Sequence, residues 1–141
     1  MKFAIAFSSL VALASASVIQ TRADYPECGP TTGGFYVPET VTRGQAFPVR
    51  FCSDTYAKTS SKSITLALNP QSQKSVNGAV ILTDALVSDN GKKYDFEATV
   101  PESLDLTGNA FLAVVEKIND YYVESSYAVH WVSFRIEAPA S

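Results

Sequence analysis

The sequence holds few of the residues on which catalysis and metal binding depend. Its 141 residues include one histidine, His130, and two cysteines. A single histidine excludes the histidine brace of secreted copper oxygenases, which needs two, and a zinc site usually needs three or four His, Cys or acidic ligands. The G-x-S-x-G motif of hydrolases is also missing. We therefore expect no catalytic residue, no metal site and no cofactor.

A small hydrolase is the one enzymatic alternative that stays open. It would use His130, or the carboxylates of Asp95 and Glu97, which lie two residues apart on one face of a predicted strand. Glycosidases work with two acidic residues. The simpler interpretation of Asp95 and Glu97 is an ordinary polar sheet face. The simpler interpretation of His130 is a partly buried histidine at a strand end, held by a hydrogen bond.

A long apolar run occurs once, at residues 3–14. Lys2 precedes the run, and Ala14-Ser15-Ala16 gives the small-x-small pattern that signal peptidase accepts. The run is shorter than the roughly 20 apolar residues that span a bilayer. We expect a signal peptide over residues 1–16, a secreted protein and no membrane anchor.

Basic residues are sparse and scattered, and the formal net charge is −3. Nucleic-acid binding proteins normally carry a basic stripe or patch. The sequence therefore argues against a nucleic-acid partner.

The two cysteines, Cys28 and Cys52, form an even pair in a chain expected to be secreted, which predicts a disulfide. Cys28 lies in a loop-like N-terminal segment rich in proline and glycine, residues 17–34, which we call the lead. Cys52 ends a segment in which Phe47, Val49 and Phe51 alternate with polar or small residues, as in a half-buried strand. The disulfide would thus pin the lead over the outside of a sheet.

The pattern of residues 35–141 predicts a β-sandwich domain of short strands separated by turns. The predicted strands cover residues 35–38, 47–52, 64–68, 79–82, 94–100, 110–115 and 127–136. The continuous apolar run 110–115 is typical of a central strand covered on both faces. We predict an all-β fold, an immunoglobulin-like antiparallel β-sandwich of about seven strands with one disulfide. The predicted core comprises Phe47, Val49, Phe51, Leu66, Phe96, Val114 and Phe134.

Aromatic residues gather near one predicted hairpin, at residues 119–127: Tyr121, Tyr122 and Tyr127, with Trp131 nearby in the sequence. Tyr121 and Tyr122 stand in the loop beside Asp120 and Glu124. Tyrosine offers a large contact area with little loss of rotamer entropy, so these four residues are the candidate binding site. The alternative is that the aromatic side chains pack at the edge of the sandwich.

Two segments carry a resemblance to secreted fungal proteins. The segments VPETVTRGQAFPVRF (residues 37–51) and FEATVPESLDLTGNAFLAV (residues 96–114) are similar to the fungal necrosis-inducing secreted protein family. That resemblance implies a secreted effector that dampens plant immunity by binding immune kinases. The same outline resembles the immunoglobulin-like N-terminal domain of fungal cell-wall β-glucan assembly proteins.

We expect a secreted, non-enzymatic binding or interaction protein, effector-like in its action. The alternative is a module associated with the cell wall or with carbohydrate. The expected partner is accordingly a protein or a cell-wall polysaccharide.

Overall fold

The computed structural model of the chain describes residues 24–30, 33–54, 59–70, 74–88, 90–120 and 126–140. Strands make up most of this described part of the chain. They are β1 (Gly34–Tyr36), β2 (Thr40–Thr42), β3 (Ala46–Cys52), β4 (Thr59–Asn69), β5 (Val80–Leu86), β6 (Lys93–Thr99), β7 (Gly108–Asp120) and β8 (Ser126–Glu137). The predicted signal peptide, residues 1–16, lies outside the described residues.

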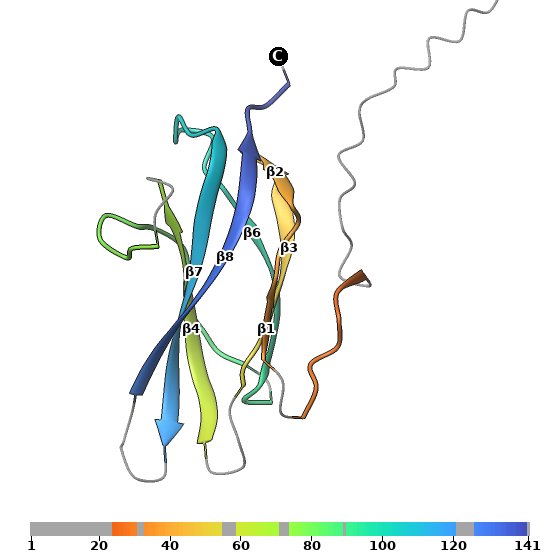
Figure 1. The fold of residues 1–141 in the computed structure, drawn as a ribbon, viewed down its shortest axis with the longest axis vertical. Helices are drawn as coiled ribbons and strands as arrows, with labels where there is room; N and C mark the ends of the chain where they lie inside the picture. The colour runs from red at the N-terminus through yellow and green to blue at the C-terminus, as the bar shows by residue number, and fades with distance from the viewer. Residues whose placement is uncertain are drawn as a thin grey trace, which may run out of the picture.

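The strands form two sheets that face each other, as in an immunoglobulin-like sandwich (Figure 1). The smaller sheet has the order β1-β3-β6, and the larger has the order β2-β8-β7-β4-β5. All pairings are antiparallel except β2 with β8, which run parallel. The all-β sandwich with one disulfide confirms the predicted fold class, with this parallel pair as a departure from it.

One strand among the described residues was missing from the prediction. The three-residue strand β2 is too short for an alternating pattern, and its partner β8 lies at the other end of the sequence. A second difference concerns β4, which already begins at Thr59. Its serine-rich start has no apolar alternation, but it pairs with the far end of β7, from Thr59 opposite Asp120 to Ser61 opposite Ile118.

The core lies between the two sheets and follows the alternation of the sequence. The seven predicted core residues are all buried, with exposed fractions from 0 to 9%. Phe51 packs edge-on against Phe35 of β1 and tilted against Tyr94 of β6. β7, which contains the apolar run 110–115, is the middle strand of its sheet, so the prediction of a central strand is confirmed.

The lead crosses the outer face of the smaller sheet, as the alternation in β3 predicted. Cys28 is bonded to Cys52, with their Cα atoms 5.4 Å apart. Tyr25 is 5% exposed, stacks on Tyr36 and donates a hydrogen bond from its hydroxyl to the carbonyl oxygen of Pro48 at 3.0 Å. The predicted disulfide and its position over the outside of the sheet are therefore both confirmed.

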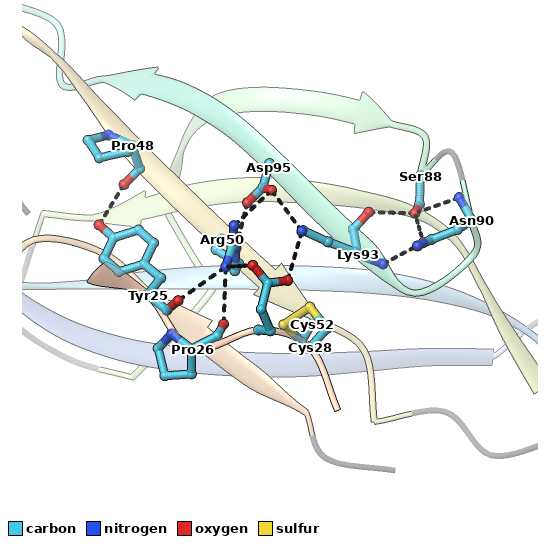
Figure 2. A network of polar contacts seen from close by, with 11 residues as sticks. Tyr25, Pro26, Cys28, Pro48, Arg50, Cys52, Ser88, Asn90, Lys93 and Asp95 are labelled. Carbon is cyan, nitrogen blue, oxygen red and sulfur yellow. Dashed lines mark hydrogen bonds and ion pairs between the residues drawn. A yellow bond between two sulfur atoms is a disulfide. The ribbon is translucent and has the colours of Figure 1, made fainter. Parts of the chain in front are cut away.

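Arg50 joins the lead to the sheet (Figure 2). Its side chain is nearly buried and donates to the carbonyl oxygens of Tyr25 and Pro26 and to a carboxylate oxygen of Glu27. On β6 the same guanidinium contacts both carboxylate oxygens of Asp95, at 2.8 and 3.1 Å. Lys93 completes the network by pairing with Glu27 and Asp95. This network supplies the partners that a buried guanidinium requires.

The sequence Asp89-Asn90-Gly91 predicts a tight turn before β6. Gly91 has φ +71°, a left-handed conformation that glycine adopts without strain. The side-chain oxygen of Asn90 accepts hydrogen bonds from the backbone nitrogens of Lys92 and Lys93. Asp89, the first residue of the predicted turn, lies outside the described residues.

Candidate functional site

The outer face of the larger sheet carries a stripe of apolar side chains along β8. Tyr127 is 67% exposed and Val129 is 44% exposed, and Trp131 follows on the same face. The intervening His130 points the other way, with its ring 4.9 Å from the ring of Phe51 in the core. Tyr127 and Val129 therefore face solvent and take no part in the core.

The stripe continues sideways across neighbouring strands. The register places Val129 opposite Val115 of β7, and Trp131 opposite Ala113. Ala113 lies opposite Ala67 of β4, which in turn lies opposite Ile81 of β5. One cross-strand row therefore consists of Ile81, Ala67, Ala113 and Trp131. Ile81 is 58% exposed, whereas the two alanines are almost covered.

We call the accessible part of this apolar face the outer patch, defined by Tyr127, Val129, Trp131, Val115 and Ile81. Ala67 and Ala113 lie between these residues in the register but are almost covered. An open hollow of about 550 Å³ lies on the same sheet and is lined in part by Phe111, Ser133 and Arg135. Contiguous apolar surface beside a polar rim is typical of an interaction site.

The predicted binding residues stand next to this surface in the sequence. Asp120 is the last residue of β7, and its side chain lies outside the described residues, as do Tyr121, Tyr122 and Glu124. These residues connect β7 to β8, the two strands that carry most of the outer patch. Of the aromatic residues predicted around this hairpin, the structure places Tyr127 and Trp131 on one face. The alternative of aromatic edge packing does not hold for Tyr127, which is mostly exposed.

A second arrangement, which sequence reasoning missed, lies inside one end of the sandwich. Glu116 of β7 is a charged residue, yet its side chain is completely buried between the sheets. Its Oε1 is 3.1 Å from Nε2 of His130 on β8. Asp54, in the segment after β3, brings a carboxylate oxygen to within 4.8 Å of ligand atoms of both residues. The three side chains form a polar cluster beside the apolar core.

The polar surroundings keep Glu116 ionised despite its burial. Burial raises the pKa of this carboxyl, but the hydrogen bond from His130 and the nearby hydroxyls of Ser53 and Ser61 outweigh it and hold the pKa below its ordinary value. Ser61 also shares a 2.8 Å hydrogen bond with the hydroxyl of Tyr94. Burial raises the pKa of Tyr94, and the charge of Glu116 adds to the rise.

The signal for this cluster was present in the alternation of two strands. Alternation along residues 127–136 puts His130 on the same face as Val132, Phe134 and Ile136, which is the core face. Glu116 continues the inward phase of Leu112 and Val114, so a charged residue stood at a core position. The expectation that His130 is partly buried and held by a hydrogen bond is confirmed: its side chain is 27% exposed and bonded to Glu116. No local sequence pattern places Asp54 in this cluster, because its position beside Glu116 and His130 depends on the tertiary structure.

The other candidate acids of the sequence are placed apart from this cluster. Asp95 holds Arg50 with both carboxylate oxygens, and the guanidinium lowers its pKa. Glu97 is exposed two residues further along β6. They share the outer face of the smaller sheet, as predicted, with Asp95 engaged in binding the lead.

Comparison with known proteins gives structural likeness alone. No family model and no curated protein matches the chain. Among solved structures, a superoxide reductase (neelaredoxin) from Ignicoccus hospitalis is similar over 77% of this chain and 80% of its own, with 17% identity and a TM-score of 0.48. Murine CRIg is similar over 77% of this chain and 99% of its own, with 7% identity and a TM-score of 0.43. At these values the likeness assigns neither a ligand nor an activity.

Proposed function

We propose that the chain is a secreted, non-enzymatic binding protein whose contact surface is the outer patch on β7 and β8. The observation that carries this proposal is the exposure of Tyr127 and Val129 on a sheet whose opposite face already builds the core. Exposed tyrosine on a rigid strand presents a large surface at low entropic cost. The effector-like role that the family resemblance implies belongs to the same proposal.

Secretion is supported by the disulfide. Disulfides persist in oxidising compartments, and the Cys28–Cys52 bond fits an extracellular protein. Within the described ranges, no helix is long and apolar enough to cross a membrane. The sequence pattern of residues 1–16 supplies the proposed route of export.

A protein partner fits the outer patch better than a polysaccharide does. The patch combines two aromatic residues with valine and isoleucine, and such mixed apolar surface is buried at protein interfaces. Sugar-binding faces need polar groups interleaved with their aromatic platforms. The acidic residues Asp120 and Glu124, next to the patch in sequence, favour a partner with a basic rim.

Site-specific photo-crosslinking tests this proposal. A benzophenone amino acid is placed at Tyr127, and in a matched control at Glu97, which is exposed on the outer face of the opposite sheet. The secreted protein is then illuminated in the extracellular fluid into which it is released. We expect a protein adduct from position 127 that is missing from position 97.

Three results would contradict the proposal. Equal crosslinking from both positions would mean that the outer patch is not the contact surface. An adduct between two copies of this chain would make the patch a dimer interface. Retention on insoluble cell-wall polysaccharide that is lost with Tyr127→Ala would favour the carbohydrate module.

A further inference from the structure

The polar cluster of Asp54, Glu116 and His130 places two carboxylates beside one imidazole. Glu116 is completely buried, and a buried carboxylate is costly unless it is paired. Among the ion pairs of the described residues, Glu116 has His130 as its single partner. Asp54 brings a second carboxylate to the same place.

One buried oxygen of Glu116 is free to act as a further ligand. Oε1 of Glu116 contacts His130, and the hydroxyls of Ser53 and Ser61 lie near the carboxylate, but Oε2 is buried and accepts no well-formed hydrogen bond. Buried polar atoms are nearly always satisfied, so an orphaned carboxylate oxygen needs an explanation. Coordination of a metal ion would satisfy such an atom, and the two other side chains of the cluster can both ligate one.

The distances in the cluster suit a small metal ion. Two ligand atoms on a tetrahedral zinc ion lie about 3.4 Å apart, because each bond is about 2.0–2.1 Å long. Nε2 of His130 and Oε1 of Glu116 lie 3.1 Å apart, close to that value, so an ion bound to both would replace the proton of their hydrogen bond. All three ligand atoms lie within 4.8 Å of one another, and Asp54 is exposed in the segment that follows β3.

We propose that Asp54, Glu116 and His130 bind a divalent transition-metal ion at the open end of the sandwich. The imidazole selects against Mg²⁺ and Ca²⁺, which prefer all-oxygen ligand sets, and Zn²⁺ accepts mixed nitrogen and oxygen ligands. Three protein ligands leave a coordination position for water or for a group of a partner. The site lies on the inner side of the larger sheet, so it is independent of the outer patch.

Titration of the untagged, disulfide-bonded protein with Zn²⁺ tests the proposal by calorimetry. We expect binding of one ion, with no comparable binding of Mg²⁺ or Ca²⁺. Asp54→Asn should weaken Zn²⁺ binding at least about tenfold, since even outer-shell partners of a metal site are worth that much. Because Asp54 is exposed, the metal-free variant should melt like the wild type. Glu97→Gln, an exposed carboxylate on the other sheet, is the matched control and should bind Zn²⁺ normally.

The single histidine of the chain gives a second readout. The imidazole nitrogen resonances belong to His130 alone, and stoichiometric Zn²⁺ should shift them. The proposal is overturned if the wild type binds no Zn²⁺, if Asp54→Asn binds it as tightly as Glu97→Gln does, or if Zn²⁺ binds without moving the His130 resonances. The last result would place the ion elsewhere on the surface.

Discussion

His130 and Glu116 join the two longest strands of the sandwich from the inside, with Nε2 of the imidazole 3.1 Å from Oε1 of the carboxylate. His130 is opposite Val114 and Glu116 is opposite Ala128, so the pair crosses diagonally between β7 and β8. The imidazole also packs against the ring of Phe51 on the facing sheet. This contact therefore connects the polar end of the interior to the apolar core.

The pair predicts a characteristic result in a double-mutant cycle. His130→Leu leaves the carboxylate of Glu116 buried without its partner, and should lower the free energy of unfolding by about 3 kcal/mol. Adding Glu116→Met removes the buried charge, so the double variant should regain most of that loss. Urea unfolding in the presence of a chelator measures both values. A double variant no more stable than His130→Leu alone would show that the charge of Glu116 is not what makes the single change costly.

The ion pair between Arg50 and Asp95 should make stability depend on pH. The hydrogen bonds from Arg50 lower the pKa of Asp95 below its ordinary value of 3.8, despite partial burial. The unfolded chain therefore takes up this proton more readily, and the stabilisation is complete above the unfolded pKa and is lost as the pH falls through the folded one. Asp95→Asn should cost about 1–3 kcal/mol at neutral pH.

The difference in unfolding free energy between wild type and Asp95→Asn should then shrink below about pH 4. Urea unfolding at a series of pH values measures this difference. Glu97→Gln, on the same face of β6 but exposed, should differ from wild type by less than about 0.5 kcal/mol throughout. A difference for Asp95→Asn that stays constant into the acid range would contradict the role assigned to this pair.

The disulfide should matter more for stability than for the shape of the core. Cys28 and Cys52 are separated by 24 residues, and the double change of both to Ser should lower the free energy of unfolding by about 2–4 kcal/mol. The lead should also become a site of limited proteolysis, because hydrogen bonds from Arg50 and Tyr25 then hold it without a covalent link. Unchanged stability and unchanged protease resistance would mean that the polar network alone holds the lead.

Alternation in the sequence was enough to predict most of the sandwich. Phe47, Val49 and Phe51 repeat with a period of two, and that period placed both the core and the outward positions of Arg50 and Cys52 correctly. β2 escaped prediction because three residues are too few to show a period. Its position depends on parallel pairing with β8, a long-range contact that no local pattern encodes.

The candidate sites were less accessible to sequence reasoning. The sequence shows the aromatic residues of β8. It does not show that they belong to a larger surface, because that depends on the strand registers that place Ile81, Ala67 and Ala113 in one row with Trp131. The buried cluster requires Asp54, from a segment beyond the end of β3, to meet two residues of the other sheet. These contacts form only when the two sheets pack together, so the pattern of a single strand does not predict them.

The segment between β7 and β8 leads to a further prediction. Adjacent residues of a strand point to opposite faces, so folding does not call for both Tyr121 and Tyr122. The double change Tyr121→Ala and Tyr122→Ala should leave the melting temperature nearly unchanged and weaken partner binding by at least about 2 kcal/mol if one of them is a hot spot. Loss of folding would show that these tyrosines pack in the sandwich, and unchanged binding would remove them from the contact surface.

The proposal that the outer patch is the binding surface is tested most directly by the affinity of the Tyr127→Ala variant for the partner captured by crosslinking. Tyr127 is 67% exposed, so its truncation should change the melting temperature little. At an interface centre the same truncation should weaken binding at least about tenfold, equivalent to about 1.4 kcal/mol. The matched variant Glu97→Ala on the opposite sheet should bind like wild type. Equal affinities for wild type, Tyr127→Ala and Glu97→Ala would contradict the assignment of the outer patch as the binding surface.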